Sequence, residues 1–243
     1  MSTTILQNDI NTSCFDGYTR KFSASRHQRI LDLRPWEPDI SAVIAALIHD
    51  AGVAATSFLC LAAGHTPDRS RYDYLIVDAS DLPRAALRRR RTDGGRCQIR
   101  PDIFVTRTEK GTGIEQIVVA VELKLNAWTN YVDCPAGLHV DYSNQLVCYP
   151  EGCWLNLDHP AAADVRYVWL APRAHMAKAY IESKALRDDP ETLERLYATP
   201  PAYLRQEVAW STAWRKATLE DLAASIAPHA PGVAELIRHW MAA

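Results

Sequence analysis

The chain has 243 residues, of which 48% are hydrophobic and 23% are charged, with 14 Pro and 10 Gly. This composition is typical of an ordered globular protein and excludes fibrous and largely disordered classes. A formal net charge of −2 argues against a protein that coats nucleic acid indiscriminately, although a local basic groove is compatible with it.

The cysteines are scattered, at positions 14, 60, 97, 134, 148 and 153. Scattered cysteines are expected to be reduced, and the chain has neither a signal-like start nor an apolar run long enough for a membrane span. We therefore expect a cytoplasmic protein with no membrane partner. A zinc site made by Cys134, His139, Cys148 and Cys153 is disfavoured because these residues lack a close Cys-x-x-Cys pair.

Hydrophobic period and turn residues predict the elements in chain order. An N-terminal arm over 1–34 precedes an apolar helix that Asp39 can cap and Gly52 can end. Runs with the aromatic and β-branched content of strands follow at 56–63, 72–79, 98–107, 115–125 and 165–172.

The residues between the last two strands predict a helix. It starts at Asp141 to Asn144 and continues through Gln145 to Tyr149, where Pro150 would stop it. Beyond Ala174 the chain is expected to be mostly helical, with apolar residues at three- and four-residue spacing over 191–198, 218–227 and 232–242. The sequence thus predicts an α/β core over 35–174 and a helical C-terminal extension over 175–243, packed on the core.

The strand over 115–125 carries two ionisable residues on one face. Alternation places Glu122 and Lys124 on one side with Val118 and Ala120, and it places on the other side Ile117, Val119, Val121, Leu123 and Leu125. A hairpin that turns at Gly111-Thr112-Gly113 pairs residues whose numbers sum to about 224, as those of Asp102 and Glu122 do. Directly opposed residues have Cβ atoms roughly 4.5–5.5 Å apart, so these two carboxylates would be able to hold one divalent cation.

These residue types suit phosphodiester hydrolysis. Mg²⁺ held by one or two carboxylates activates water and stabilises charge on a phosphate, and a neighbouring lysine adds positive charge. Pro101-Asp102, followed after a gap by Glu122-Leu123-Lys124 at the end of an apolar strand, resembles the motif of the PD-(D/E)xK nuclease superfamily. The resemblance covers about half the chain and implies a restriction-endonuclease-like mixed β-sheet flanked by helices, with the core order α-β-β-β-α-β.

The resemblance also implies roles for individual residues. Asp102 and Glu122 would bind Mg²⁺, or Mn²⁺, and Lys124 would serve the attacking water. A further acidic residue often comes from the first helix of the family, for which Glu37 is the first candidate and Asp39 the second. Gln145 and Tyr149 are similar to the Gln-x-x-x-Tyr element of RecB-like nucleases, in which both side chains face the active site.

The implied substrate is DNA, in bacterial defence, restriction or repair. A cluster of arginines just before the hairpin suits phosphate contacts, with a solvated loop as the alternative: Arg84, Arg88, Arg89, Arg90, Arg91, Arg96 and Arg100. Cleavage of RNA, assembly as a homodimer, a DNase toxin, and a catalytically inactive nucleic-acid-binding or scaffold protein on the same fold all stay open. Tryptophans in apolar contexts are expected in the core rather than against bases: Trp154, Trp169, Trp210, Trp214 and Trp240.

Overall fold

A five-stranded mixed β-sheet organises the protein. The computed structural model describes residues 37–47, 50–78, 88–90, 96–98, 101–125, 131–133, 142–144, 165–176 and 214–242. The sheet has the order β1-β4-β5-β8-β9. Its strands are β1 (Tyr72–Asp78), β4 (Ile103–Glu109), β5 (Glu115–Leu123), β8 (Arg166–Ala171) and β9 (Trp214–Thr218). The first three strands are antiparallel, whereas β8 runs parallel to β5 and β9 runs parallel to β8.

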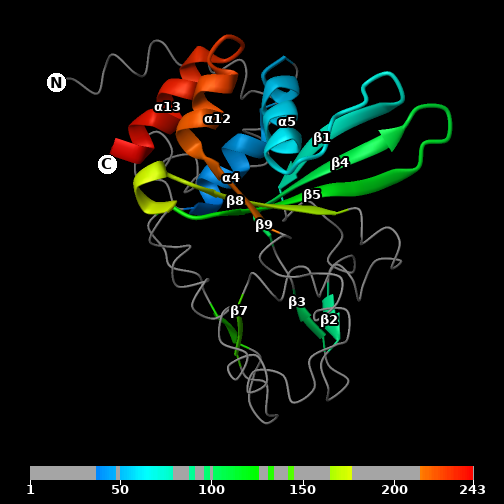
Figure 1. Cartoon of the computed structure of the whole chain (residues 1–243), viewed down its shortest axis with the longest axis horizontal. Coiled ribbons are helices and arrows are strands. Elements are labelled where there is room, and N and C mark those ends of the chain that lie inside the picture. The colour runs from blue at the N-terminus through cyan, green and yellow to red at the C-terminus, as the bar shows by residue number, and fades with distance from the viewer. Residues whose placement is uncertain are drawn as a thin grey trace.

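The described long helices gather on one face of this sheet (Figure 1). They are α4 (Glu37–Ala45), α5 (Asp50–Ala62), α12 (Leu219–Ile226) and α13 (Pro231–Ala242). Fully buried side chains from both layers meet in one core, among them Ile44, Leu59, Val121, Leu170 and Leu222. The class is therefore α/β, as the sequence predicts. No helix in the described ranges is long and apolar enough to cross a membrane.

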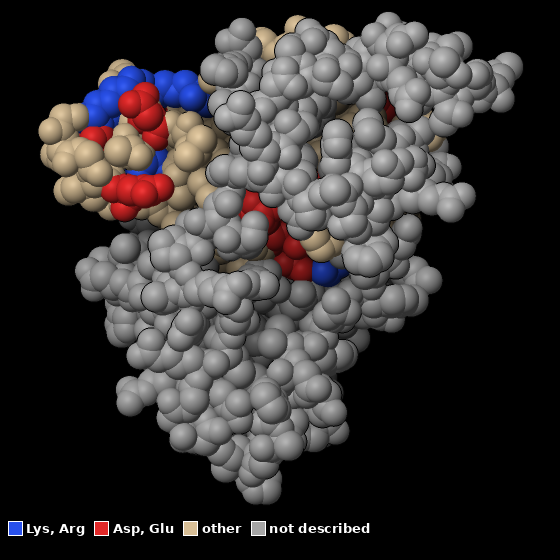
Figure 2. All heavy atoms as spheres, turned by 180° about the vertical axis from the view of Figure 1, so that it is seen from behind, with Lys and Arg blue, Asp and Glu red and all other residues tan. Residues whose placement is uncertain are grey.

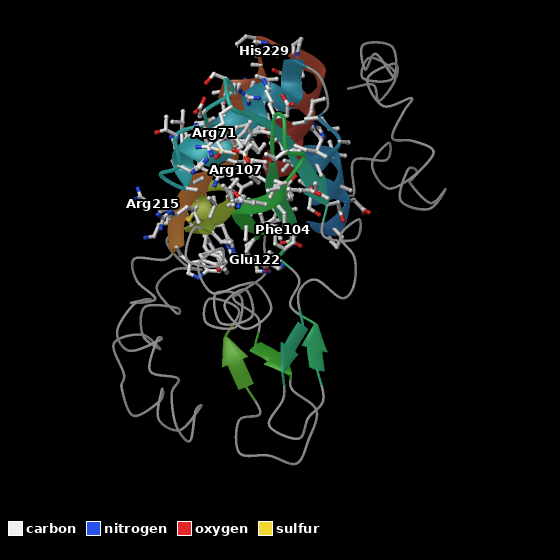
Figure 3. All side chains as sticks on the ribbon, turned by 90° about the vertical axis from the view of Figure 1, so that its right-hand side faces the viewer. Arg71, Phe104, Arg107, Glu122, Arg215 and His229 are labelled. Atoms are coloured by element: carbon white, nitrogen blue, oxygen red, sulfur yellow. The ribbon has the colours of Figure 1, made fainter. Side chains whose placement is uncertain are left out.

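Two small antiparallel sheets accompany the main one. One pairs β2 (Arg88–Arg90) with β3 (Arg96–Gln98), and the other pairs β6 (Tyr131–Asp133) with β7 (Tyr142–Asn144). Figures 1 and 3 both draw β2, β3 and β7 on the side of the main sheet away from the four helices. The arginine-rich strand β2 therefore lies on the side of the main sheet away from those helices (Figure 1).

The prediction of a strand over 56–63 is wrong, because these residues belong to α5 and to the turn after it. Gly52 does not end the first helix; α4 ends at Ala45, and Gly52 lies in the first turn of α5. A Cβ at Gly52 would lie 1.9 Å from the carbonyl oxygen of Leu47, so glycine permits the close packing of the two helices at this point. Asp39 likewise lies inside the first turn of α4 rather than at its N-cap.

Two further boundaries differ from the prediction. The prediction of a helix that starts at Asp141 to Asn144 is wrong over Tyr142–Asn144, which form strand β7. Ser and Asn are poor helix formers and Tyr favours strands, so these residues suit a strand. The strand expected over 98–107 starts at Ile103, after Pro101, whereas Gln98 ends the separate strand β3. The residues around Pro101 thus link two sheets.

The part of the chain beyond Ala174 is not only helical. Trp214–Thr218 form β9, the edge strand beside β8 in the main sheet. The helices expected over 218–227 and 232–242 are confirmed as α12 and α13, and α12 starts at an N-cap where the Asp221 amide donates to Thr218 Oγ1 at 3.1 Å. The helix expected over 191–198 lies outside the described residues.

Candidate active site

The hairpin of β4 and β5 has the predicted register at the end that carries the motif. Its last pairs are Ile103 with Val121, Phe104 with Ala120, and Val105 with Val119, and each pair of numbers sums to 224. A register shift follows, since Thr106 pairs with Ile117. Val118 is the extra residue at this bulge and joins the buried core, so its predicted place on the same face as Glu122 is wrong.

The turn of the hairpin forms where the sequence predicts it. Gly111 and Gly113 have φ of 95° and 70°, which glycine adopts without steric cost. The Glu109 amide donates to the Ile114 carbonyl at 2.9 Å, and the Thr112 hydroxyl donates to Glu109 Oε2 at 2.9 Å. These bonds fix the turn, and with it the register of the strand pairs nearest to it.

Asp102 lies one residue before β4, and its side chain reaches the neighbouring strand. The Leu123 amide donates a hydrogen bond to Asp102 Oδ2 at 2.8 Å. This bond ties the aspartate carboxylate to the backbone at the residue that follows Glu122. Direct opposition of Asp102 and Glu122, one step beyond the last pair of the ladder, is what the register of 224 predicts.

Glu122 and Lys124 form a buried ion pair at the end of β5. Their side chains are only 2% and 3% exposed, and Lys124 Nζ donates to Glu122 Oε1 at 2.5 Å. The Lys124 amide donates to the Leu170 carbonyl at 2.8 Å, which holds this residue against the end of β8. Two buried charges at this separation attract each other strongly because little water screens them.

Aromatic side chains pack beside this ion pair. Trp169 pairs with Glu122 across the parallel ladder, and its ring centroid lies 5.9 Å from Lys124 Nζ, within the range of a cation–π contact. Trp214 packs edge-on against Trp169 at 5.9 Å and tilted against Tyr167 at 5.2 Å. These tryptophans and Trp240 are buried, which confirms their predicted place in the core, whereas Trp154 and Trp210 lie outside the described residues.

The ion pair faces away from the helical layer. Figure 3 shows Glu122 and Phe104 at the border of the described body opposite His229, which lies in the helical layer. The neighbours of Glu122 in β5, Val121 and Leu123, belong to the core between sheet and helices. Strand alternation therefore directs Glu122 to the other face, the side on which β2 and β3 are drawn.

The far end of the hairpin has a different character. Arg71 pairs with Glu109 at 2.7 Å, and Lys110 Nζ lies 3.4 Å from Asp73. The Arg71 guanidinium beside Glu109 holds the pKa of that carboxyl below its ordinary value, with a further contribution from the Thr112 hydroxyl. Figure 2 shows basic and acidic side chains side by side on this surface, so it is not a uniformly basic groove.

Several predicted site residues are placed only in part. Glu37 begins α4, but its side chain is not described, and the alternative candidate Asp39 is fully buried. Gln145, Tyr149 and Arg91 lie outside the described residues, and of Arg88, Arg89 and Arg90 only the backbone, in β2, is described. The structure thus brings together Asp102, Glu122 and Lys124 at the ends of adjacent strands.

Carboxylate oxygens are the ligands that Mg²⁺ prefers, and one or two of them suffice when water and a phosphate complete its octahedron. Asp102 and Glu122 supply two such groups at neighbouring strand ends, which fits this kind of site. Within the described ranges, no three His, Cys, Asp or Glu side chains gather as a metal-binding group. Asp102 and Glu122 are the two carboxylates that the sequence predicts as metal ligands.

Sequence reasoning missed two residues beside this site, Trp169 and Lys216. In β8, the run Arg166-Tyr167-Val168-Trp169-Leu170 is buried on both faces after its first residue, so alternation gives no sign of which side chains face the ion pair. Lys216 lies in a strand that was not predicted. Only the pairing of β5 with β8 and of β8 with β9 identifies both residues.

Comparisons with protein-family models, with curated proteins and with solved structures find no match to this chain.

Proposed function

We propose that this chain is a metal-dependent nuclease that hydrolyses phosphodiester bonds in DNA. The observation that carries the proposal is the juxtaposition of Asp102, Glu122 and Lys124 at the ends of β4 and β5, with the Asp102 carboxylate bonded to the backbone of the glutamate's strand and the lysine bonded to the glutamate. This is the set of groups that the PD-(D/E)xK resemblance implies. A role in bacterial defence, restriction or repair is the setting that the resemblance suggests.

The topology supports the finer assignment to a restriction-endonuclease-like fold. Helices precede three antiparallel strands, β1, β4 and β5, and a parallel strand, β8, is added beside β5. The order of the main-sheet strands is compatible with the strands of the α-β-β-β-α-β core, with the small sheets β2-β3 and β6-β7 inserted between them. The expected second helix lies mostly outside the described ranges, and its residues Tyr142–Asn144 form strand β7. Strand β9 and helices α12 and α13 then extend this core.

The residues of the site divide the proposed chemistry between them. Asp102 and Glu122 would hold Mg²⁺ or Mn²⁺, which supplies Lewis acidity and lowers the pKa of a bound water. Lys124 would orient the attacking water and place positive charge beside the phosphate oxygens as negative charge develops on them. The attacking water would lose a proton as it bonds to phosphorus, the bond from phosphorus to the leaving oxygen would break, and that oxygen would take up a proton.

The ion pair prepares Lys124 for this role. The Glu122 carboxylate binds its ammonium group, and the Trp169 ring lies beside it. A side chain whose position is fixed by packing and hydrogen bonds needs little reorganisation when substrate binds. The proposed site is thus built on the ends of rigid strands rather than on a loop.

The test is a cleavage panel of supercoiled plasmid, linear duplex, single-stranded DNA and RNA, with Mg²⁺, Mn²⁺ or EDTA. We expect metal-dependent cleavage of DNA by the wild-type protein and a loss of at least about a hundredfold in rate for Glu122→Gln. Glu115→Gln is the matched control, because Glu115 is an exposed glutamate at the other end of the same strand. Absence of cleavage in every arm, or equal rates for wild type and Glu122→Gln, would overturn the proposal.

A further inference from the structure

The site face continues across the sheet to a lysine on the edge strand. Glu122 pairs with Trp169 between β5 and β8, and Trp169 pairs with Lys216 between β8 and β9. Residues that are paired across a ladder lie on the same face of a sheet. Glu122, Trp169 and Lys216 therefore form one row on the face away from the helices.

The neighbours of Lys216 in β9 support this orientation. Ala217 is buried in the core between sheet and helices. Arg215 lies so near the end of α5 that a Cβ at Gly64 would lie 2.8 Å from Arg215 Cζ. Because Arg215 and Ala217 are directed to the helical side, alternation directs Lys216, an exposed residue, to the side of the ion pair.

We propose that Lys216 binds a backbone phosphate of the DNA close to the phosphate that is cleaved. This inference depends on the proposed nuclease function. Two strand spacings separate Lys216 from Glu122, about 10 Å between their backbones, whereas Lys124 lies directly against the Glu122 carboxylate, so we assign the reacting atoms to Lys124 and not to Lys216. A lysine at this distance is placed to contact a neighbouring phosphate of the same DNA strand.

The proposal predicts a contact that helps binding rather than chemistry. A lysine ammonium is a point charge without a fixed hydrogen-bond geometry, so it recognises phosphate without selecting a base sequence. Each phosphate that a protein neutralises releases counterions and contributes about 0.9 to the slope of log affinity against log salt on duplex DNA. Loss of the Lys216 contact should therefore lower this slope by about 1.

The experiment measures binding of a fluorescein-labelled DNA duplex by anisotropy, in EDTA and in Ca²⁺, at several salt concentrations. We expect Lys216→Ala to weaken binding roughly three- to tenfold at low salt and to lower the salt slope. Lys216→Arg should restore both. Arg215→Ala is the matched control, because it removes one positive charge from the adjacent position on the opposite face.

Kinetics separate this role from a catalytic one. In a cleaving protein, Lys216→Ala should raise KM with little change in kcat, since the contact is made equally in the ground state and the transition state. An unchanged Kd and salt slope in Lys216→Ala, or an equal effect of Arg215→Ala, would overturn the inference. A change mainly in kcat for Lys216→Ala would also overturn the inference.

The binding arm does not depend on cleavage, so the two proposals can fail separately. Wild-type cleavage with no effect of Lys216→Ala on binding would refute only the phosphate contact. Binding that depends on Lys216 in a protein that cleaves nothing would refute the nuclease function and leave a phosphate contact. A wild-type protein that does not bind the duplex would overturn the phosphate contact.

Discussion

Replacing Lys124 with alanine tests whether the ion pair at the end of β5 is as buried as the structure describes it. The two side chains are 2% and 3% exposed, with 2.5 Å between Nζ and Oε1. Removal of one partner from such a pair leaves a charge in a place that water does not reach, at a cost of about 3–5 kcal/mol. Lys124→Ala should therefore lower the free energy of unfolding as well as remove activity.

Urea denaturation in EDTA measures the effect. With a slope of about 2–3 kcal/mol per molar urea, as expected near the upper end for a chain of this size, the midpoint should fall by about 1–2.5 M. Lys110→Ala is the control, since the ion pair of Lys110 with Asp73 and its hydrogen bond to the Arg69 carbonyl are both exposed. Such pairs contribute about 0–1 kcal/mol, so the midpoint of this variant should change little.

The physical reason can be checked with a double variant and with metal. Glu122→Gln combined with Lys124→Met removes both charges together and should recover most of the lost stability, because no unpaired charge is left. Mg²⁺ added to Lys124→Ala should also restore stability, by about 2.7 kcal/mol at a hundredfold excess over Kd. An equal midpoint for wild type and Lys124→Ala would refute the buried ion pair.

Three further outcomes follow from the described residues. Asp102→Asn should abolish metal-dependent cleavage with little loss of stability, since the amide oxygen can still accept from the Leu123 amide; an unchanged rate would exclude Asp102 from the site. Burial raises the pKa of the Cys60 thiol to about 12, so iodoacetamide near pH 8 should modify Cys60 only after unfolding, as peptide mass mapping would reveal, and rapid modification of the folded protein would contradict this burial. Because Arg71 lowers the folded-state pKa of Glu109, the pair stabilises the fold above the ordinary carboxyl range and loses this contribution as pH falls; Arg71→Ala should thus reduce the drop in unfolding free energy from about pH 6 to about pH 3, and an identical drop would argue against the pair.

The antiparallel part of the sheet was predictable because its signals are local. β1 and the two strands of the hairpin have strand-forming residues, and the hairpin turn contains two glycines with positive φ. The register of 224 near the motif agrees with the prediction, but it depends on the bulge as well as on the turn, because the pairs nearest the turn sum to 223. The bulge at Val118 was not predictable, because an extra residue in a strand changes neither composition nor the apolar pattern of its neighbours.

The helices α4 and α5 were predicted less well than the hairpin. Residues 56–63 contain both apolar and β-branched or aromatic side chains, which suit a buried strand as well as a buried helix. In the structure, the buried residues Ala55, Leu59 and Ala63 recur every four positions, as on one face of a helix. Gly52 was interpreted as the end of a helix, whereas its role is to let α5 approach Leu47 closely.

The sequence by itself determined the motif, the hairpin that joins Asp102 to the strand of Glu122, and the face on which Glu122 and Lys124 lie, because turns and alternation act between neighbouring residues. Only the tertiary structure decided that this ion pair is buried and packed against Trp169. It also decided that Lys216 lies in the same row, since the parallel pairing of β5, β8 and β9 joins segments far apart in the chain. Such pairing depends on the packing of whole layers, which no local pattern in the sequence encodes.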